Sequence, residues 1–550
     1  METSTVKAQK IRFDRNIDIG SLEAEDDSFL LTSFVAKTDY DALADTNNQK
    51  CIILGRTGMG KSALIRKLCE EKENCARIKP EEMSLRFLSN SDILDYFRRL
   101  GISLDLFYKV LWKHVFIVEF LKLFYGEDKI KTGNKLQTLI ESVDFKFNKK
   151  KRNAIEYLRK WHDKFWENTE YRIKEIEDTL RKSLRSSLGV EAKLFDDFVA
   201  AKLGSEADKI IQQSKKAEII HKAQTVVNDI QLSEISTILD IIQKDLLPKT
   251  PKKFYIVIDD LDKHWVDKKV VYDLIIALIL TIKEVNNCPN FKVIISVRLN
   301  LMQLSLQKAN TTGFQREKFE NMFLHLYWDE SELKTLLQNR INTLLKSFNI
   351  VTPIDVSDIL PKDSGRGGKS DGFSYILYRS FFRPRDIISF FNKAIKYSKG
   401  NSRITREAIN LAESDYSLER LNAIEDEWNE NYDVLSAYFS VLKGKRNRFN
   451  SDDIDGRDIE HFCKTLHNKT RHRELRSITN YGWKKNRSNA TKTHILNVLY
   501  KVGCIGIKPT PDSKLMYSFH YSNTLDSFDL NPASSYYVNP ALHKALLIKT

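Results

Sequence analysis

The eight residues Gly55–Ser62 constrain this chain more than any other segment. They read Gly-Arg-Thr-Gly-Met-Gly-Lys-Ser and fit the phosphate-binding pattern G-x-x-x-x-G-K-[ST]. The apolar run Cys51–Leu54 precedes them, and a helical stretch, Ser62–Glu70, follows. A glycine-rich turn between a strand and a helix lets backbone N–H groups surround phosphate oxygens, toward which the helix directs its positive end. The segment therefore predicts a binding site for a nucleoside triphosphate.

The same pattern assigns roles to single residues. Lys61 is expected to reach the β- and γ-phosphates, and Ser62 to hold Mg²⁺. No N/T-K-x-D base-reading motif occurs in the core, which favours ATP over GTP. The residues predicted to bind the nucleotide here are Gly55, Arg56, Thr57, Gly58, Met59, Gly60, Lys61, Ser62 and Ala63.

A second motif, Phe254–Asp262, supplies the carboxylates that such a site needs. Five apolar residues, Phe254–Ile258, predict a fully buried parallel strand that ends in an acidic turn. Asp259 is the expected Mg²⁺ ligand, and Asp260 is expected to orient or activate the attacking water. Many ATPases carry Glu at the second position, and the shorter Asp predicts slow turnover.

A third strand is predicted over Phe291–Arg298. In P-loop ATPases with an extra strand between the two motif strands, a polar residue here senses the γ-phosphate. Ser296 and Arg298 are the two candidates, and a solvated strand end is the alternative for either. A short strand over Phe323–Trp328 and a helix opening at Asp329 are expected next, since acidic residues suit a helix start.

These motifs, in this order, resemble the AAA+/STAND branch of P-loop ATPases. The Ile258–Asp262 box is similar to that of origin-recognition-type initiators, STAND switch ATPases and KAP-type bacterial ATPases. The arrangement most resembles stand-alone bacterial P-loop ATPases found in phage-defence or DNA-repair gene clusters. Lys61 and Asp259 lie much farther apart than in ordinary AAA+ proteins, so a long insertion is expected, which argues against a hexameric ring.

The resemblance also extends to Phe381–Asp386, which opens a helix over Ile387–Tyr397. Related lid domains carry a proline beside the adenine and an arginine that reaches the γ-phosphate. By position these are Pro384 and Arg385, with Arg383 as the rival, and the alternative is an ordinary helix start. Oligomeric relatives place a trans-acting arginine near Arg316, for which ordinary surface exposure is the alternative.

The expected fold is α/β: a P-loop NTPase parallel-sheet core with a large helical insertion, a helical lid and a C-terminal winged-helix-like domain. An N-terminal segment is expected to pack on the core. The predicted boundaries are 1–48 for this segment, 49–84 and 246–328 for the core, 85–245 for the insertion, 329–435 for the lid and 436–550 for the basic C-terminal domain.

Charge indicates an anionic partner besides the nucleotide. The net charge is +14, and 14 Lys or Arg stand against 6 Asp or Glu between Lys443 and Lys492. A helix over His494–Val502, followed by strands near Ile505–Ile507 and Leu515–Tyr521, resembles a winged-helix module. Such modules bind DNA through a helix and basic residues, but also serve as protein-contact domains.

The remaining composition bears on location. Six cysteines lack paired spacing, so neither a disulfide framework nor a zinc site is predicted. The N-terminus is polar, and the apolar stretches near 102–125 and 274–282 fit buried helices better than membrane spans. A cytoplasmic protein without a membrane partner is the expectation.

Two functions follow from the sequence. One is a Mg²⁺-dependent ATPase that senses or acts on nucleic acid, with antiviral defence as the expected role. The other is a STAND-like switch that holds ATP and drives homo-oligomerisation or controls a partner effector protein. A third interpretation, a binding protein without activity, is disfavoured because Lys61, Ser62, Asp259 and Asp260 are all present.

Overall fold

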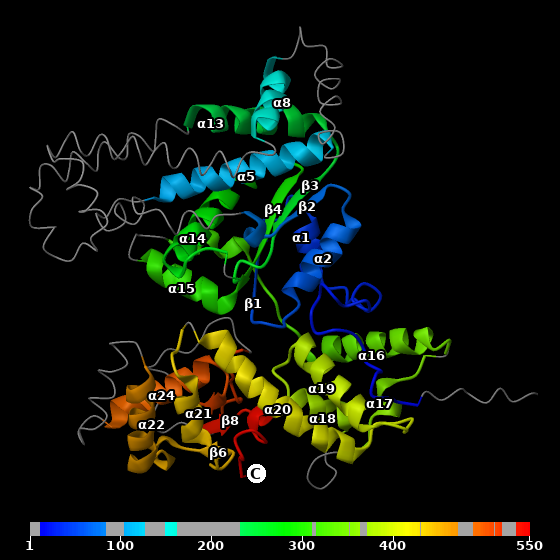
Figure 1. The fold of residues 1–550 in the computed structure, drawn as a ribbon, viewed down its shortest axis with the longest axis vertical. Helices are drawn as coiled ribbons and strands as arrows, with labels where there is room; N and C mark the ends of the chain where they lie inside the picture. The colour runs from blue at the N-terminus through cyan, green and yellow to red at the C-terminus, as the bar shows by residue number, and fades with distance from the viewer. Residues whose placement is uncertain are drawn as a thin grey trace, which may run out of the picture. The chain divides into compact units, whose positions relative to one another are not determined.

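The computed structural model describes residues 12–83, 104–126, 149–161, 232–263, 265–310, 315–350, 353–363, 371–429, 431–470, 488–510, 512–519 and 535–549. Its contacts divide into two compact units. The first, here called the loop unit, comprises Met1–Lys37, Gly55–Ala63 and His325–Thr550. The second, called the sheet unit, comprises Thr38–Leu54 and Leu64–Leu324. Figure 1 labels the helices and strands of both, and each unit is described by itself.

A five-stranded sheet forms the centre of the sheet unit. Its strand order is β2-β3-β4-β1-β5, and β3 pairs in parallel with both β2 and β4. The extra strand predicted between the two motif strands is confirmed, because β4 lies between β1 and β3. The strands span Ile52–Gly55 (β1), Cys75–Ile78 (β2), Phe254–Ile258 (β3), Phe291–Arg298 (β4) and Phe323–His325 (β5).

Burial on both faces explains the apolar runs of β3 and β4. Side chains alternate between the two faces of a strand. On one face, the rings of Phe254 and Phe291 contact Phe120 of α5 (Asp105–Tyr125). On the other, Tyr255 and Lys292 hydrogen-bond to carbonyls in and just after α1 (Thr38–Ala44).

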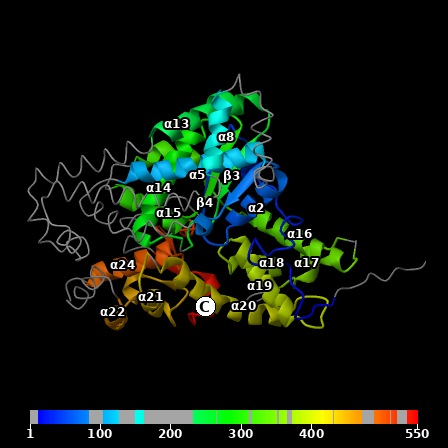
Figure 2. The same cartoon turned by 45° about the horizontal axis from the view of Figure 1, so that its top comes forward.

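Helices cover both faces of this sheet. α14 (Lys268–Val285) and α15 (Leu299–Asn310) lie on one side, and α2 (Lys61–Glu71) lies on the other in both views (Figures 1 and 2). Figure 1 shows α1 on the same side as α2. Buried Trp112 of α5 donates a hydrogen bond to the Leu274 carbonyl of α14 at 3.0 Å and anchors the two helices to each other. Among its described residues, the unit also contains α8 (Lys149–Trp161), α13 (Leu232–Ile241) and the short η1 (Pro80–Met83), η2 (Ile242–Leu246), η3 (Leu247–Lys249) and η4 (Arg316–Met322).

The loop unit contains a group of helices that follows β5 in the chain. The predicted start at Asp329 is confirmed: its side chain caps α16 by accepting from the Glu332 amide, and Glu332 returns the bond in a capping box. The predicted helix after Phe381 is also present, with Pro384 at its first position. These helices are α16 (Glu330–Ser347), α17 (Val356–Ile359), α18 (Gly372–Tyr378), α19 (Pro384–Tyr397) and α20 (Arg406–Trp428).

The last part of the loop unit combines helices with a small antiparallel sheet. The sheet has the order β6-β8-β7, and Ile507 of β7 also bridges to Met516. Its buried residues and the helices share one core with α16–α20. The elements are α21 (Leu435–Leu442), β6 (Arg448–Phe449), η6 (Ser451–Asp453), α22 (Gly456–Lys469), α24 (Ser488–Lys501), β7 (Ile505–Lys508), β8 (Ser535–Val538) and η8 (Pro540–Leu542).

Several predictions fall outside the described residues. They include most of the 85–245 insertion, the basic cluster Lys484–Arg487 and the end of the expected strand at Leu515–Tyr521. Of the insertion, 104–126, 149–161 and 232–245 are described, and each of these segments is helical over most of its length. Within the described ranges, every helix is too short or too polar to cross a bilayer.

Candidate nucleotide site

The loop Gly55–Ser62 begins at the last residue of β1 and ends in the first turn of α2. Gly58 and Gly60 adopt φ values of +82° and +93°, which glycine reaches without steric cost. The loop curls around the Lys61 ammonium, whose Nζ donates to the carbonyls of Gly55 and Arg56 at 3.1 Å each. The lysine thus lies on the inside of the turn that its pattern predicted.

The next three carbonyls of the loop also accept hydrogen bonds. Arg383 Nη1 donates to the Thr57 carbonyl at 2.8 Å, and the Arg385 amide donates to the Gly58 carbonyl at 3.3 Å. The indole of Trp328 donates to the Met59 carbonyl at 2.9 Å. The segment before α16 and the first residues of α19 therefore supply the donors that fix the carbonyls of the loop. With its carbonyls held on one side, the turn directs its backbone amides to the other side.

Glu427, near the end of α20, holds the backbone of the loop from a different direction. Its Oε1 accepts from the Thr57 amide at 3.0 Å, and its Oε2 lies 3.5 Å from Arg383 Nη1. Arg383 also donates to Asp386 at 2.9 Å, and Asp386 accepts from Arg420 at 2.9 Å. The four charged side chains are buried and form one chain of alternating sign.

The pKa values of these four charged side chains follow from their pairing with one another. Burial opposes ionisation of Glu427, but Arg383, Arg420 and Arg56 together lower its pKa below the ordinary value. Burial likewise disfavours the charged form of Arg383. The negative charges of Asp386 and Glu427 outweigh the effect of burial and raise the pKa of Arg383. Both groups therefore stay charged at neutral pH, and removal of either leaves the buried group of charges unbalanced.

Arg56, the second residue of the loop, points into the C-terminal part of the loop unit. Its Nη2 donates to the Lys501 carbonyl and to Ser518 Oγ, both at 2.8 Å, and its Nη1 lies 3.4 Å from the Val502 carbonyl. The guanidinium also lies over the ring of Trp428. Burial lowers the pKa of Arg56 to about 10 although Glu427 opposes this. Through its hydrogen bonds to the Lys501 and Val502 carbonyls, the Arg56 side chain links the loop to the end of α24.

The two lid arginines occupy different environments. Arg383 is buried and engaged by Asp386, Glu427 and the Thr57 carbonyl. Arg385 is partly exposed, and a Cβ placed on Gly58 would lie 2.8 Å from the Arg385 Cβ. Pro384 is buried in the first turn of α19. Both arginines contact the loop, Arg383 through the Thr57 carbonyl and Arg385 through Gly58. The predicted roles of Pro384, Arg385 and its rival Arg383 toward the nucleotide stay predictions.

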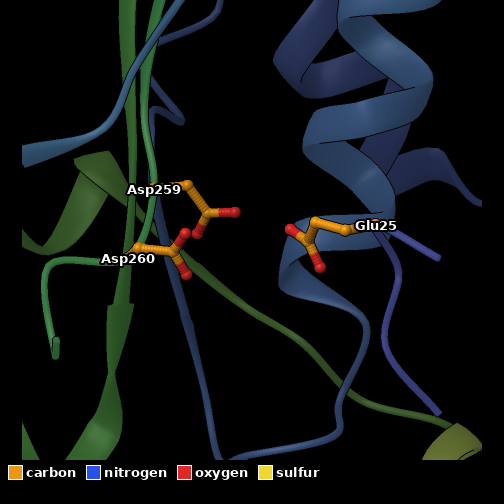
Figure 3. A group of neighbouring side chains, drawn as sticks. All are labelled: Glu25, Asp259 and Asp260. Carbon is orange, nitrogen blue, oxygen red and sulfur yellow. The ribbon is translucent and has the colours of Figure 1, made fainter. Parts of the chain in front are cut away.

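In the sheet unit, Asp259 and Asp260 lie at the end of β3 (Figure 3). Asp259 is buried, accepts from Ser296 Oγ of β4 and pairs with Arg77 of β2 at 3.1 Å. Ser296 is one of the two candidate γ-phosphate sensors, and the structure places its hydroxyl in hydrogen-bond contact with Asp259, the predicted Mg²⁺ ligand. Arg77 has no motif around it, and only the pairing of β2 with β3 places it beside Asp259.

Asp260 has an unusual backbone conformation. Its φ is +60°, which a side chain with a Cβ seldom adopts, and such outliers cluster at functional sites. It pairs with Lys263 at 3.1 Å. Burial and the neighbouring Asp259 raise the pKa of Asp260, and the contact with Lys263 opposes this.

The other two predicted arginines pair locally. Arg298, at the end of β4, forms an ion pair with Asp262, so it belongs to the same acidic turn. Arg316 is half-exposed and pairs with Glu320 in η4 at 2.7 Å. The trans-acting role proposed for Arg316 is not tested by a single chain.

The donor groups of each unit, taken by itself, suit part of a magnesium–nucleotide complex. Carboxylate and hydroxyl oxygens, as at Asp259 and Ser62, are the ligands that Mg²⁺ prefers, and an enclosed ammonium such as Lys61 suits phosphate. Sequence reasoning gave Asp386 no role although it closes the Phe381–Asp386 segment, and it missed Glu427, Trp328 and Arg420 altogether. For these last three the reason is the same. Their contacts join segments distant in the chain, and no local pattern marks them.

Comparison with known proteins gives three findings. Residues 331–425 match the family model described as the FunZ-associated C-terminal helical domain, which covers the helices from α16 into α20. The chain is 24% identical over 422 residues to an Escherichia coli (strain K12) protein described as "Putative transposon gamma-delta 80.3 kDa protein". That alignment covers 75% of this chain and 51% of the relative, so the chain spans about half the length of the curated relative it matches.

The third finding is structural. A Walker-type ATPase of Pyrococcus abyssi aligns over 94% of this chain and 96% of its own, at 11% identity and a TM-score of 0.36. At that score the alignment carries no argument about this chain, and the nucleotide site rests on its own residues.

Proposed function

We propose that the protein is a Mg²⁺-dependent ATP-binding and ATP-hydrolysing enzyme. The observation that supports this most is the Gly55–Ser62 loop, which encloses Lys61 and has its carbonyls from Gly55 to Met59 engaged by hydrogen bonds. Such a loop offers amides and an ammonium to phosphate oxygens. ATP rather than GTP is the proposed substrate because the core has no guanine-reading motif.

The proposed roles follow the positions of the side chains. Lys61 binds the β- and γ-phosphates, and Ser62 and Asp259 hold Mg²⁺. Asp260 orients the attacking water, and Ser296 positions Asp259 through its hydrogen bond. Arg385, which packs on Gly58, is the proposed contact to the γ-phosphate, and Pro384 is proposed beside the adenine.

We further propose that nucleic acid controls this activity through the C-terminal part of the loop unit. Support comes from its exposed basic residues, among them Arg446, Arg448 and Lys549, which lie on or beside the small sheet. Lys and Arg exposed in this way bind phosphate backbones without reading sequence. We propose in addition that this C-terminal part is a winged-helix-like domain and that the protein acts in antiviral defence.

The second candidate is a STAND-like switch that retains ATP and controls an effector protein or self-association. One observation favours it: Arg56 connects the nucleotide loop directly to the end of α24. A nucleotide that reshapes the loop would thereby move C-terminal backbone without any need for rapid turnover.

One experiment separates the two candidates. ATP hydrolysis is measured on the purified full chain alone and with single-stranded DNA, duplex DNA or RNA, with Lys61→Ala as the control for contaminating activity. Stimulation by one nucleic acid supports the first candidate and identifies the ligand. Slow turnover that no nucleic acid changes, together with bound nucleotide that survives gel filtration, supports the switch.

The assignment of the loop has its own test. Lys61→Ala removes the main phosphate contact and is expected to weaken ATP binding at least about tenfold. Unchanged ATP affinity in this variant would show that the nucleotide binds elsewhere.

A further inference from the structure

Two cysteines of the sheet unit, one of them in the helix that follows the nucleotide loop, face each other. Cys69 lies in the last turn of α2, and Cys75 is the first residue of β2. Their Sγ atoms are 3.0 Å apart, and both side chains are partly exposed. The other four cysteines are buried. The pair therefore combines proximity with access, which none of the buried thiols has.

The surrounding backbone fixes this approach. The Lys72 amide bonds to the Leu68 carbonyl at 3.0 Å and completes the last turn of α2. The Tyr255 amide bonds to the Asn74 carbonyl at 2.8 Å, and Cys75 then pairs in register with Tyr255 of β3. The short turn between the cysteines is thus held at both ends by hydrogen bonds, so the thiols stay close in the folded chain.

The two thiols differ in character. A hydrogen bond from Cys75 lowers the pKa of Cys69, and the positive charge of Arg77 adds to the effect against burial. The same contact, together with burial, raises the pKa of Cys75. Cys69 is accordingly the thiol that ionises first, with Cys75 as its donor, which is the arrangement of an attacking and a resolving cysteine.

We propose that Cys69 and Cys75 are a reversible oxidation site that takes hydroperoxides as its substrate class. The Cys69 thiolate attacks one peroxide oxygen, the O–O bond breaks, and the sulfur becomes a sulfenic acid as hydroxide or alkoxide leaves. The Cys75 sulfur then attacks the Cys69 sulfur, the S–O bond breaks, and water leaves with the thiol proton. Two electrons pass from the two thiols to the peroxide, and a thiol reductant returns them.

The location gives the bond a consequence. A disulfide would tie the last turn of α2 to β2, and Arg77, two residues beyond Cys75, pairs with Asp259. In the oxidised form the disulfide therefore restrains β2, the strand that carries Arg77, which is the ion-pair partner of Asp259. Neither the reaction nor its detection depends on ATP binding.

The test treats the reduced full chain with hydrogen peroxide and follows intact mass and peptide maps. The wild type is expected to lose about 2 Da through a Cys69–Cys75 cross-link, which dithiothreitol reverses. Cys75→Ser is expected to stop at a sulfenic acid on Cys69, about 16 Da heavier and trapped by a 1,3-diketone such as dimedone. Cys69→Ser is expected to leave Cys75 at least about tenfold less reactive than Cys69 in the wild type.

Two controls keep the outcome decisive. The circular dichroism and melting temperature of each serine variant establish that it is folded, and a urea-unfolded sample shows how fast the pair reacts without the fold. Over-oxidation without a 69–75 cross-link, or equal rates in folded and unfolded protein, would overturn the proposal. Because no step uses nucleotide, a chain that fails to bind ATP can still pass this test.

Discussion

Glu427 accepts a hydrogen bond from the Thr57 amide at 3.0 Å although the two residues lie 370 positions apart in the chain. Its second carboxylate oxygen lies 3.5 Å from Arg383, which itself donates to the Thr57 carbonyl. One residue of the nucleotide loop is therefore held at both its amide and its carbonyl by a buried ion pair. The conformation of the loop depends on that pair.

Glu427→Gln should destabilise the loop unit strongly. The amide keeps the size of the side chain but removes one of the two carboxylates that balance the buried Arg383 and Arg420, and breaking a buried pair costs about 3–5 kcal/mol. Denaturant unfolding measures the change. Glu419→Gln on the same helix is the matched control, because Glu419 is exposed and pairs with Lys393 at the surface. Equal stability in the two variants would contradict the argument.

Gly58→Ala should weaken ATP binding at least about tenfold, because the new Cβ would lie 2.8 Å from the Arg385 Cβ at a φ of +82°. Fluorescent-nucleotide titration measures the affinity. Gly60→Ala in the same loop separates clash from backbone strain, since Gly60 has a φ of +93° and its added Cβ would meet only Trp328, at 3.9 Å. If both variants bind ATP like the wild type, the close approach to Arg385 has no bearing on the site.

Arg56→Lys should uncouple the loop from the C-terminal residues while ATP binding persists. A lysine ammonium cannot satisfy the Lys501 and Val502 carbonyls and Ser518 Oγ in the fork geometry of a guanidinium. Hydrogen exchange of peptides covering 499–508 should become faster. Arg448→Lys, at an exposed position of β6, is the control. Unchanged protection at 499–508 would argue against the link.

Asp260→Asn should retain ATP binding and lose hydrolysis by about a hundredfold or more, because an amide cannot accept a proton from water. Single-turnover hydrolysis with matched nucleotide occupancy measures the effect. Asp262→Asn is the companion variant, since Asp262 instead pairs with Arg298. If turnover persists in Asp260→Asn and fails in Asp262→Asn, the roles of the two carboxylates are exchanged.

Lys292 predicts that the stability of the sheet unit depends on pH. It is buried, and burial lowers its pKa from 10.5 to about 8. Below pH 8 the folded state carries the full cost of the buried charge. Between about pH 8 and 10.5 the folded lysine loses its proton before the unfolded one does, so stability rises with pH.

Comparison with Lys292→Met removes the contribution of groups that do not sense the Lys292 charge, and the buried Cys51 thiol is the neighbour that does. The difference in unfolding free energy, wild type minus variant, should rise by up to about 3 kcal/mol across that range. Urea unfolding at a series of pH values measures it, and a difference that is flat with pH would show that Lys292 does not titrate as inferred.

Local patterns predicted the elements that depend on local chemistry. The glycine spacing located the loop between β1 and α2, the apolar run located β3, and the acidic residues at Asp329 located the start of α16. The prediction that an extra strand separates the motif strands is also confirmed by β4. Each of these rests on residues within a few positions of one another.

What the sequence could not show was which distant residues hold the loop. Glu427 and Arg420 lie in a helix whose charged residues look alike in sequence, and only two of them are turned inward to Arg383 and Asp386. Arg56 occupies a position that the motif leaves open, so nothing in the pattern predicted its contacts. The strands β6 and β8 were also missed, because β6 is two residues long.

The position of Arg56 limits how this protein can be divided. A fragment that ends before residue 501 would retain the nucleotide loop but leave a buried guanidinium without its three oxygen acceptors. Expression of the nucleotide-binding half alone should therefore give an insoluble or aggregating product. Domain dissection of this chain requires a change at position 56 to be made together with the truncation.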